Sequence, residues 1–257
     1  MTLAFRPRLW LGALCAAAVM TVSASAQTSP AQKEEFEKII REYLLKNPEV
    51  IQEAIVELRK RQEQAEIKAR SEALKTQRET LFNSPRGIVI GNPKGNVTLV
   101  EFFDYNCGYC KRAMEDVTAL SKANPKLRVV LKDFPILGPD SVEASRVAVA
   151  AKNQLQGAKY FEFHNKLMAV KGKVNAAKAL DVAKEAGADV AQLKKDIEAP
   201  ATKAAIADTV ALGDRLGLTG TPAFIIGDEI VFGAVGQAAL KAKIDSVRRC
   251  GKTDCAG

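Results

Sequence analysis

Histidine, glycine in the N-terminal third and long apolar runs are scarce in this sequence. His164 is the only histidine in 257 residues, and no other side chains have the spacing of a zinc site. A zinc site would need the cysteines near the C-terminus, so the composition argues against a metalloenzyme. Residues 31–82 contain no glycine and one proline, which excludes a turn-rich or stranded segment there. There is no internal repeat or low-complexity segment.

The one long apolar run, residues 9–22, predicts a secretory signal peptide. It follows Arg6 and Arg8 and precedes a small-x-small cleavage site that ends at Ala26. The run is short of the ~20 residues that span a bilayer, which argues against a membrane anchor. Cys15 lies inside it with a leucine before it, where a lipoprotein site needs a small residue, so we expect no lipid anchor. The mature chain would then begin at Gln27 and act in an exported compartment.

The net charge and its distribution argue against nucleic acid as a partner and exclude few other partners. The formal net charge of +8 falls to about +6 once the signal peptide is removed, a moderate excess for a long chain. Basic and acidic residues are interleaved, as in residues 57–63, and this pattern is typical of a solvated helix face. A phosphate-binding surface would need clustered basic residues.

Residues 31–82 are predicted to be helical, because their apolar residues recur at helical spacing. Asn47-Pro48 divides the segment, since Asn is a good N-cap and Pro is accepted at the first helical position. Beyond Leu58 the apolar stripe thins, so that part needs a partner or lies in solvent. The stripe is Phe36, Ile39, Ile40, Tyr43, Leu44, Val50, Ile51, Ala54, Ile55 and Leu58.

Two interpretations of this helical segment are open. Residues 27–86 could be an oligomerisation stalk whose stripe packs against copies of itself, or an arm folded back on its own domain. Isolated helices are marginal in water, which favours the stalk. Residues 83–87 are turn-rich and would be the linker.

The remaining chain, residues 87–257, is predicted to be one α/β domain. Residues 88–90, 97–103 and 127–133 read as strands, with a helix over 107–122 between the last two, and this βαβ unit implies parallel strands. Residues 141–216 are helical, broken at Gly157, Gly172, Gly187 and Ala199-Pro200. A hairpin over 222–232 and a helix over 237–249 follow. The core would comprise about 87–135 and 218–249, around an all-helical insertion over about 136–217.

Cys107 and Cys110 lie where the second strand meets its helix. The N–H groups of a helix N-terminus favour a thiolate, so Cys107 would be the nucleophile. Cys110, one turn on, would displace a mixed disulfide in the second step of thiol-disulfide exchange. An inert disulfide and half of a zinc site are the alternatives, and the strand-to-helix position favours redox chemistry over both.

Two further elements accompany this pair. In Gly220-Thr221-Pro222, a cis Thr221-Pro222 bond would present the Thr221 backbone beside the cysteines for pairing with an extended substrate; a trans strand-start proline is the alternative. Cys250 and Cys255 would close a short C-terminal loop as a structural disulfide. A second redox pair is the sharper alternative, but no helix N-terminus activates either thiol.

Several motifs together resemble the DsbA family, a thioredoxin fold interrupted by a helical domain. The resemblance covers about residues 88–249. It implies Cys107 as nucleophile, Cys110 as resolving thiol, Pro222 as the cis-proline, and Glu101 as the acid that moves a proton from Cys110. A strand residue satisfied by a local lysine is the other interpretation of Glu101. The motifs are the runs 100–111, 133–135 and 219–224.

The residues between the cysteines differ from those of strongly oxidising DsbA proteins, which have Pro-His. Gly108-Tyr109 and Thr221 are similar to the disulfide isomerases DsbC and DsbG. A tyrosine cannot supply the charge by which an imidazolium stabilises the thiolate. With the stalk, the chain resembles the ScsC (suppressor of copper sensitivity) branch of the family.

This resemblance implies a periplasmic homotrimer that rearranges or reduces disulfides in misfolded proteins. A membrane reductase of the ScsB/DsbD type would supply electrons, and no cofactor is expected. A link to copper would involve Cu(I) at Cys107 and Cys110, since Cu(I) suits two thiolates. Three hypotheses stay open: an oligomeric isomerase or reductase, a monomeric dithiol oxidase, and a periplasmic copper-binding protein.

Overall fold

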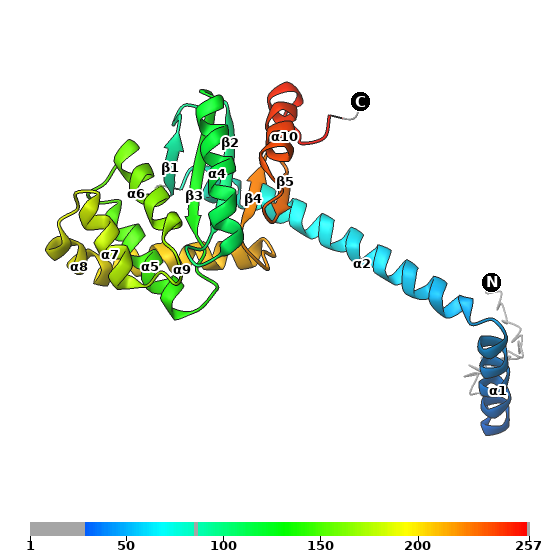
Figure 1. The fold of residues 1–257 in the computed structure, drawn as a ribbon. Coiled ribbons are helices and arrows are strands. Elements are labelled where there is room, and N and C mark those ends of the chain that lie inside the picture. The colour runs from blue at the N-terminus through cyan, green and yellow to red at the C-terminus, as the bar shows by residue number, and fades with distance from the viewer. Residues whose placement is uncertain (1–28, 85–86, 256–257) are drawn as a thin grey trace, which may run out of the picture. The chain divides into compact units, whose positions relative to one another are not determined.

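The computed structural model describes residues 29–84 and 87–255. The predicted signal peptide, residues 1–26, with Cys15 and the cleavage site at Ala26, lies outside this part. The described chain falls into two compact units, one up to Lys60 and one from Arg61. Each is taken by itself, and Figure 1 labels their elements.

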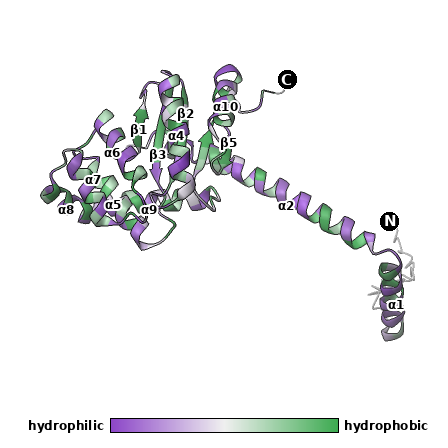
Figure 2. Ribbon diagram, in the orientation of Figure 1, coloured by the Kyte–Doolittle hydropathy of each residue, from purple (hydrophilic) through white to green (hydrophobic). Residues whose placement is uncertain are grey.

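The first unit is helical, as predicted. It comprises α1 (Pro30–Lys46) and the first part of α2 (Glu49–Thr76). Ser29 and Gln32 form a capping box at the start of α1, which satisfies two of its free N–H groups. Within this unit no residue of α1 is buried, and Figure 2 shows hydrophobic residues recurring along both helices. The large apolar side chains exposed here are Phe36, Ile39, Ile40, Tyr43, Leu45, Ile51, Ile55, Val56 and Leu58.

The break at Asn47-Pro48 is confirmed, but the side chain of Asn47 acts on the other helix. Its Nδ2 donates to the carbonyl of Tyr43 at 2.9 Å, and its N–H donates to the same carbonyl. Asn47 therefore closes the end of α1 and does not cap the start of α2 through its side chain.

The second unit contains a five-stranded mixed sheet in the order β1-β3-β2-β4-β5. The predicted parallel pair is present, since β2 and β3 run parallel from Val97↔Leu127 to Phe103↔Asp133. The other pairs are antiparallel. The strands are β1 (Ile88–Gly91), β2 (Val97–Phe103), β3 (Leu127–Asp133), β4 (Ala223–Ile226) and β5 (Glu229–Phe232).

Helices cover both faces of this sheet because successive side chains of β2 point to opposite faces. Leu99 and Phe103 pack with α4 (Gly108–Ala123), α10 (Gln237–Cys250) and α6 (Ala158–Ala169). Val100 and Phe102 pack with α9 (Pro200–Arg215) on the other face. The result is the expected thioredoxin fold with a helical insertion.

The insertion consists of α5 to α9, and its breaks fall where the sequence predicted them. Figure 1 shows α5, α7 and α8 gathered at one end of this unit. Gly157 precedes α6, Gly172 lies between α6 and α7, Gly187 lies between α7 and α8, and Ala199 separates α8 from α9. The bounds not yet given are α5 (Pro139–Ala151), α7 (Ala176–Glu185) and α8 (Val190–Glu198).

The end of the segment assigned to the stalk packs on the sheet of its own chain. Residues 78–82 form a short helix, α3 (Arg78–Phe82), where the sequence predicted only the end of a long one. Leu74 and Leu81 are buried with Val100 and Phe102, and Arg128 donates to the carbonyl of Phe82 at 2.6 Å. For residues 70–82 the folded-back arm is thus the better description, because this face of the sheet supplies the apolar surface that the sequence did not place nearby, whereas residues 61–69 are exposed.

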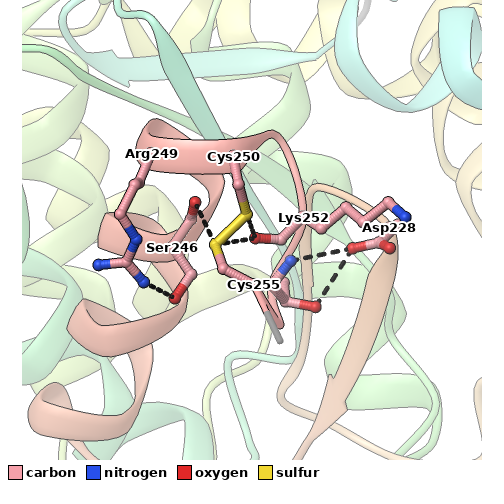
Figure 3. The surroundings of a disulfide bond; sticks show 7 residues. Asp228, Ser246, Arg249, Cys250, Lys252 and Cys255 are labelled. Atoms are coloured by element: carbon pink, nitrogen blue, oxygen red, sulfur yellow. Dashed lines mark hydrogen bonds between the residues drawn. A yellow bond between two sulfur atoms is a disulfide. The ribbon is translucent and has the colours of Figure 1, made fainter. Parts of the chain in front are cut away.

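The C-terminal tail is tied back to the sheet. Cys250, the last residue of α10, forms a disulfide with Cys255 (Figure 3). Asp228, in the β4–β5 turn, accepts hydrogen bonds from the N–H and hydroxyl of Thr253 at 3.1 and 3.2 Å. No helix among the described residues is both long and apolar enough to cross a bilayer.

Replacing Leu81 tests whether α3 belongs to the catalytic unit. Leu81→Ala should lower the free energy of unfolding by about 2–5 kcal/mol, because it empties a fully buried site. Leu137→Ala, at a 54% exposed leucine of the same unit, is the matched control and should change it by less than about 0.5 kcal/mol. Urea unfolding followed by circular dichroism measures the free energy of unfolding of both variants. A loss for Leu81→Ala as small as that for Leu137→Ala would show that α3 is only a linker.

Candidate active site

Cys107 lies at the N-terminus of α4, where the chain has just left β2. It is the N-cap residue, in extended backbone, and no side chain caps the helix. Its N–H donates to the carbonyl of Asp104 at 3.0 Å, and its carbonyl accepts from the N–H of Lys111 at 3.1 Å. The N–H groups of the first turn therefore remain available to the Cys107 sulfur.

The two cysteines have opposite acidities. Cys110 donates a hydrogen bond to the Cys107 sulfur and, with the side chain of Thr221 and the backbone N–H groups of Cys110 and Tyr109, lowers the pKa of Cys107 to about 5. Burial raises the pKa of Cys110 far above its usual range, and its contact with Cys107 adds to the shift. Both thiols are free. At neutral pH the pair thus holds one thiolate and one thiol.

Thr221 and Pro222 lie directly against the nucleophile. The peptide bond between them is cis, and the Cys107 sulfur is 3.2 Å from the carbonyl oxygen of Thr221, to which it donates when it is protonated. The sequence placed these residues together although 114 positions separate them.

Glu101 lies on β2 beneath the cysteines and is only 2% exposed. Burial raises its pKa to about 8, and the negative charge of Cys107 contributes. Its Oε1 has no hydrogen-bond partner among the described residues. The lysine of the neighbouring strand, Lys132, donates instead to the carbonyl of Thr80. The sequence-based alternative, a glutamate satisfied by a local lysine, therefore does not hold.

A three-residue connection, Asp104 to Asn106, ties the nucleophile to the helical insertion. The carboxylate of Asp104 accepts from the N–H of Asn106 at 2.8 Å and from that of Leu137 at 3.0 Å. The side-chain amide of Asn106 accepts from the N–H of Val174 at 2.7 Å and donates to its carbonyl at 2.9 Å. These contacts hold the loop before α7 at a fixed place beside Cys107.

Tyr105 makes a third tie, to α6. Its hydroxyl is 3.1 Å from Nδ1 of His164, and both side chains are buried. Burial lowers the pKa of His164 to about 3, so the ring is neutral. No group of three or more His, Cys, Asp or Glu side chains in the described chain could hold a metal ion. The only histidine is thus a structural residue of the site.

The sequence did not assign a role to Asp104, Tyr105, Asn106 or His164. The available signal was two polar residues that can accept backbone hydrogen bonds, placed immediately before the nucleophile. Their partners lie 33 to 68 positions away, and no local pattern predicts them.

The acidity of Cys107 predicts how its alkylation depends on pH. The rate of reaction of the reduced protein with iodoacetamide should rise with a midpoint near pH 5, because only the thiolate reacts. In Cys110→Ala the midpoint should move up toward the ordinary cysteine pKa of about 8.5, since the largest stabilising contact is lost. Mass spectrometry of acid-quenched samples measures both, and a native midpoint near 8.5 would contradict the assignment.

Two family models match the chain. The model described as a DSBA-like thioredoxin domain matches residues 98–245. The model described as the copper resistance protein ScsC N-terminal domain matches residues 32–65. The first match includes the whole candidate site, and the second falls on the exposed apolar stripe.

Solved structures agree with both models. A thioredoxin-like oxidoreductase from Silicibacter pomeroyi DSS-3 is 47% identical with a TM-score of 0.64, over 67% of this chain and 98% of that one. A linker-deletion mutant of Proteus mirabilis ScsC is 26% identical with a TM-score of 0.66, over 88% of this chain and 99% of that one.

Curated relatives add a partial match. The Na(+)/H(+) antiporter NhaA 1 of Salinispora arenicola is 29% identical over 163 residues, 63% of this chain. The chain spans only 24% of that protein's length. Because the match to the first model covers more than half of the chain and includes both cysteines, the chain belongs to the DsbA-like family of thiol-disulfide oxidoreductases, with a ScsC-type N-terminal segment.

Proposed function

We propose that this protein is a periplasmic protein disulfide isomerase and reductase that acts on misfolded or oxidised proteins. The observation that carries the proposal is the split acidity of the free pair, with Cys107 a thiolate and Cys110 a thiol at neutral pH. An enzyme that rearranges disulfides needs a nucleophile ready to attack. The predicted signal peptide supports the location.

The first step is attack by the Cys107 thiolate on a substrate disulfide. A bond forms between Cys107 and one substrate sulfur, and the other substrate sulfur leaves as a thiolate. The main chain of Thr221, which contacts the Cys107 sulfur, is placed to pair with an extended substrate segment.

Two second steps are available from this mixed disulfide. In isomerisation, the released substrate thiolate attacks another substrate disulfide, and a substrate thiol finally displaces Cys107 as a thiolate. In reduction, Cys110 loses its proton and attacks the Cys107 sulfur, which releases the reduced substrate and leaves a Cys107–Cys110 disulfide. Glu101, a buried base with a pKa of about 8, would accept that proton.

A dithiol oxidase is the second candidate, and the low pKa of Cys107 favours it. A stabilised thiolate makes the corresponding disulfide a stronger oxidant. Gly108-Tyr109 places no cationic side chain between the cysteines, and the guanidinium of Arg112 stacks over the ring of Tyr109 at 4.5 Å. Oligomerisation through the N-terminal segment would distinguish the isomerase from the oxidase, since an isomerase benefits from several active sites around one substrate.

The exposed stripe on the first unit supports assembly, and we propose a homotrimer through residues 27–60. Phe36, Ile40 and Tyr43 recur at helical spacing on α1, and each is more than half exposed. Exposed apolar stripes of this kind mark interaction surfaces. Residues 70–82 contribute less, because they contact the second unit, in which Leu74 and Leu81 are buried.

The family resemblance adds two further proposals. A membrane reductase of the ScsB/DsbD type would restore the dithiol in two steps. One of its thiolates would attack the Cys107 sulfur and release Cys110 as a thiolate, and a second thiol of the reductase would then displace Cys107 and leave the reductase with a disulfide. Copper tolerance would involve Cu(I), which prefers thiolate ligands. Cys107 and Cys110 fit such an ion as a two-coordinate site, being the free cysteines of the described chain.

The assembly and the activity can be tested together. Ile40→Lys should convert the mature oligomer to single chains and reduce refolding of scrambled ribonuclease by at least about tenfold, because it charges the centre of the stripe. Leu45→Lys is the matched control: it lies nine residues from Phe36, about half a turn out of phase, and is itself exposed. Light scattering gives the mass of each variant.

The outcomes distinguish the candidates. A native protein that is a single chain, oxidises reduced ribonuclease and leaves the scrambled form unchanged would be a dithiol oxidase. Equal effects of Ile40→Lys and Leu45→Lys would reject the stripe as the interface.

The role of Glu101 predicts a second pH dependence. The rate at which Cys110 resolves the mixed disulfide should rise with pH as Glu101 loses its proton. The midpoint of this rise should lie at or below pH 8, because the Cys107 charge that helps raise the pKa of Glu101 is absent in the mixed disulfide. In Glu101→Gln this rise should be lost and the rate at high pH should fall about 100-fold. Alkylation of Cys107 is the control and should stay fast. A resolving step with the same pH profile in both proteins would remove Glu101 from the mechanism.

A further inference from the structure

A surface pocket of about 470 Å³ begins at the residues on either side of the nucleophile. Asn106 and Gly108, the chain neighbours of Cys107, line it together with Lys111, Asp140 and Lys173. Its size is within the range of pockets that hold small ligands, about 300–1,000 Å³. A polypeptide bound to Cys107 in a mixed disulfide therefore has room to place side chains in this pocket.

The loop between α6 and α7, residues 170–175, forms one wall of this pocket. Four lysines lie in this loop or bond to it, and we name them the lysine rim: Lys111, Lys171, Lys173 and Lys178. Lys171 and Lys173 belong to the loop itself, between α6 and α7. Lys111, from α4, donates to the carbonyls of Val170 and Gly172. Lys178, from α7, donates to the carbonyls of Lys173 at 2.7 Å and Lys171 at 3.5 Å.

The charge of the lysine rim is only partly offset. Asp140 is 3.5 Å from Lys173, and Glu143 accepts from the N–H of Ala176. Bonds from ammonium groups to carbonyls leave the positive charge in place. Among the residues that line the pocket, Lys111 and Lys173 are cationic and Asp140 is anionic, so the lining carries an excess of positive charge beside the nucleophile.

Most lysine-rich surfaces are simply solvated, but this one is fixed relative to the reacting sulfur. The side-chain amide of Asn106 makes hydrogen bonds to both the N–H and the carbonyl of Val174, which lies in the loop between α6 and α7. Lys111 is one turn from Cys107 on α4, and its N–H donates to the Cys107 carbonyl. The backbone of the loop that carries Lys171 and Lys173 is therefore placed by the same contacts that place the nucleophile.

We propose that this pocket binds acidic side chains of the substrate, so that the protein exchanges fastest with disulfides flanked by Asp or Glu. The proposal rests on the exchange activity proposed above and names its substrate class. Carboxylates beside a substrate disulfide repel an attacking thiolate and disfavour the leaving thiolate. The lysine rim offsets both effects as Cys107 bonds to one substrate sulfur and the other leaves as a thiolate.

Two peptides test this specificity with the full mature protein. They share one sequence with a single cysteine, blocked as a disulfide with neutral mercaptoethanol, and differ by Glu or Gln at the positions following the cysteine. The Glu peptide should react at least about fivefold faster at low ionic strength. The advantage should shrink toward one in about 0.5 M salt, where exposed charges are screened.

Variants then locate the effect. Lys171→Gln with Lys173→Gln should bring the ratio of the Glu-peptide rate to the Gln-peptide rate down toward one, whereas Asp140→Asn should raise this ratio. Lys194→Gln with Lys195→Gln, on α8, is the charge-matched control and should leave the ratio as in the native protein.

The possible failures are distinguishable. Equal rates for the two peptides, or a preference that the control pair removes as fully as the loop pair does, would overturn the acidic-substrate proposal and leave exchange itself intact. If neither peptide reacts, the proposed function is wrong and the specificity proposal is overturned with it.

Discussion

The position of the Cys107 sulfur at the uncapped N-terminus of α4 is the constraint on which the rest of the site depends. A thiolate in a largely buried place needs donors, and the first turn of α4 and the Cys110 thiol supply them. The same arrangement buries Cys110, so that the resolving thiol keeps its proton until a base removes it. Nucleophile and resolving group are thus distinguished by position alone, since they are chemically identical side chains.

That position is held from both sides by chain segments remote in sequence. The thioredoxin core contributes the Thr221 carbonyl next to the sulfur. The helical insertion contacts the connection before α4 through Leu137, Ser141, His164 and Val174. The insertion therefore helps to position the active site, and its loop between α6 and α7 is held close to the reacting atoms. Glu101 completes the arrangement from below, as a buried carboxyl with no cation partner among the residues that the structure describes.

Local patterns predicted the strand-to-helix junction with its two cysteines, the parallel strand pair, the breaks between the insertion helices and the turn at Gly227-Asp228. Each depends on residues close in sequence, where periodicity and turn chemistry act directly. Contacts across the fold were not predictable in this way. Asn106 bonds a residue 68 positions away, and Leu74 packs on a face of the sheet that the sequence does not place near it. The break at Asn47 was predicted correctly, but its side chain bonds to the end of α1 and not, as predicted, to the start of α2.

The central claim is that only Cys107 attacks and that Cys110 only resolves. Trapping tests this most directly: a disulfide-bonded peptide is mixed with the Cys110→Ser protein and with the Cys107→Ser protein, and the products are identified by mass spectrometry. The account predicts that Cys110→Ser accumulates a mixed disulfide at Cys107, because attack proceeds and resolution does not. Cys107→Ser should form none, since Cys110 is buried and protonated. A mixed disulfide at Cys110, formed at a comparable rate, would contradict it.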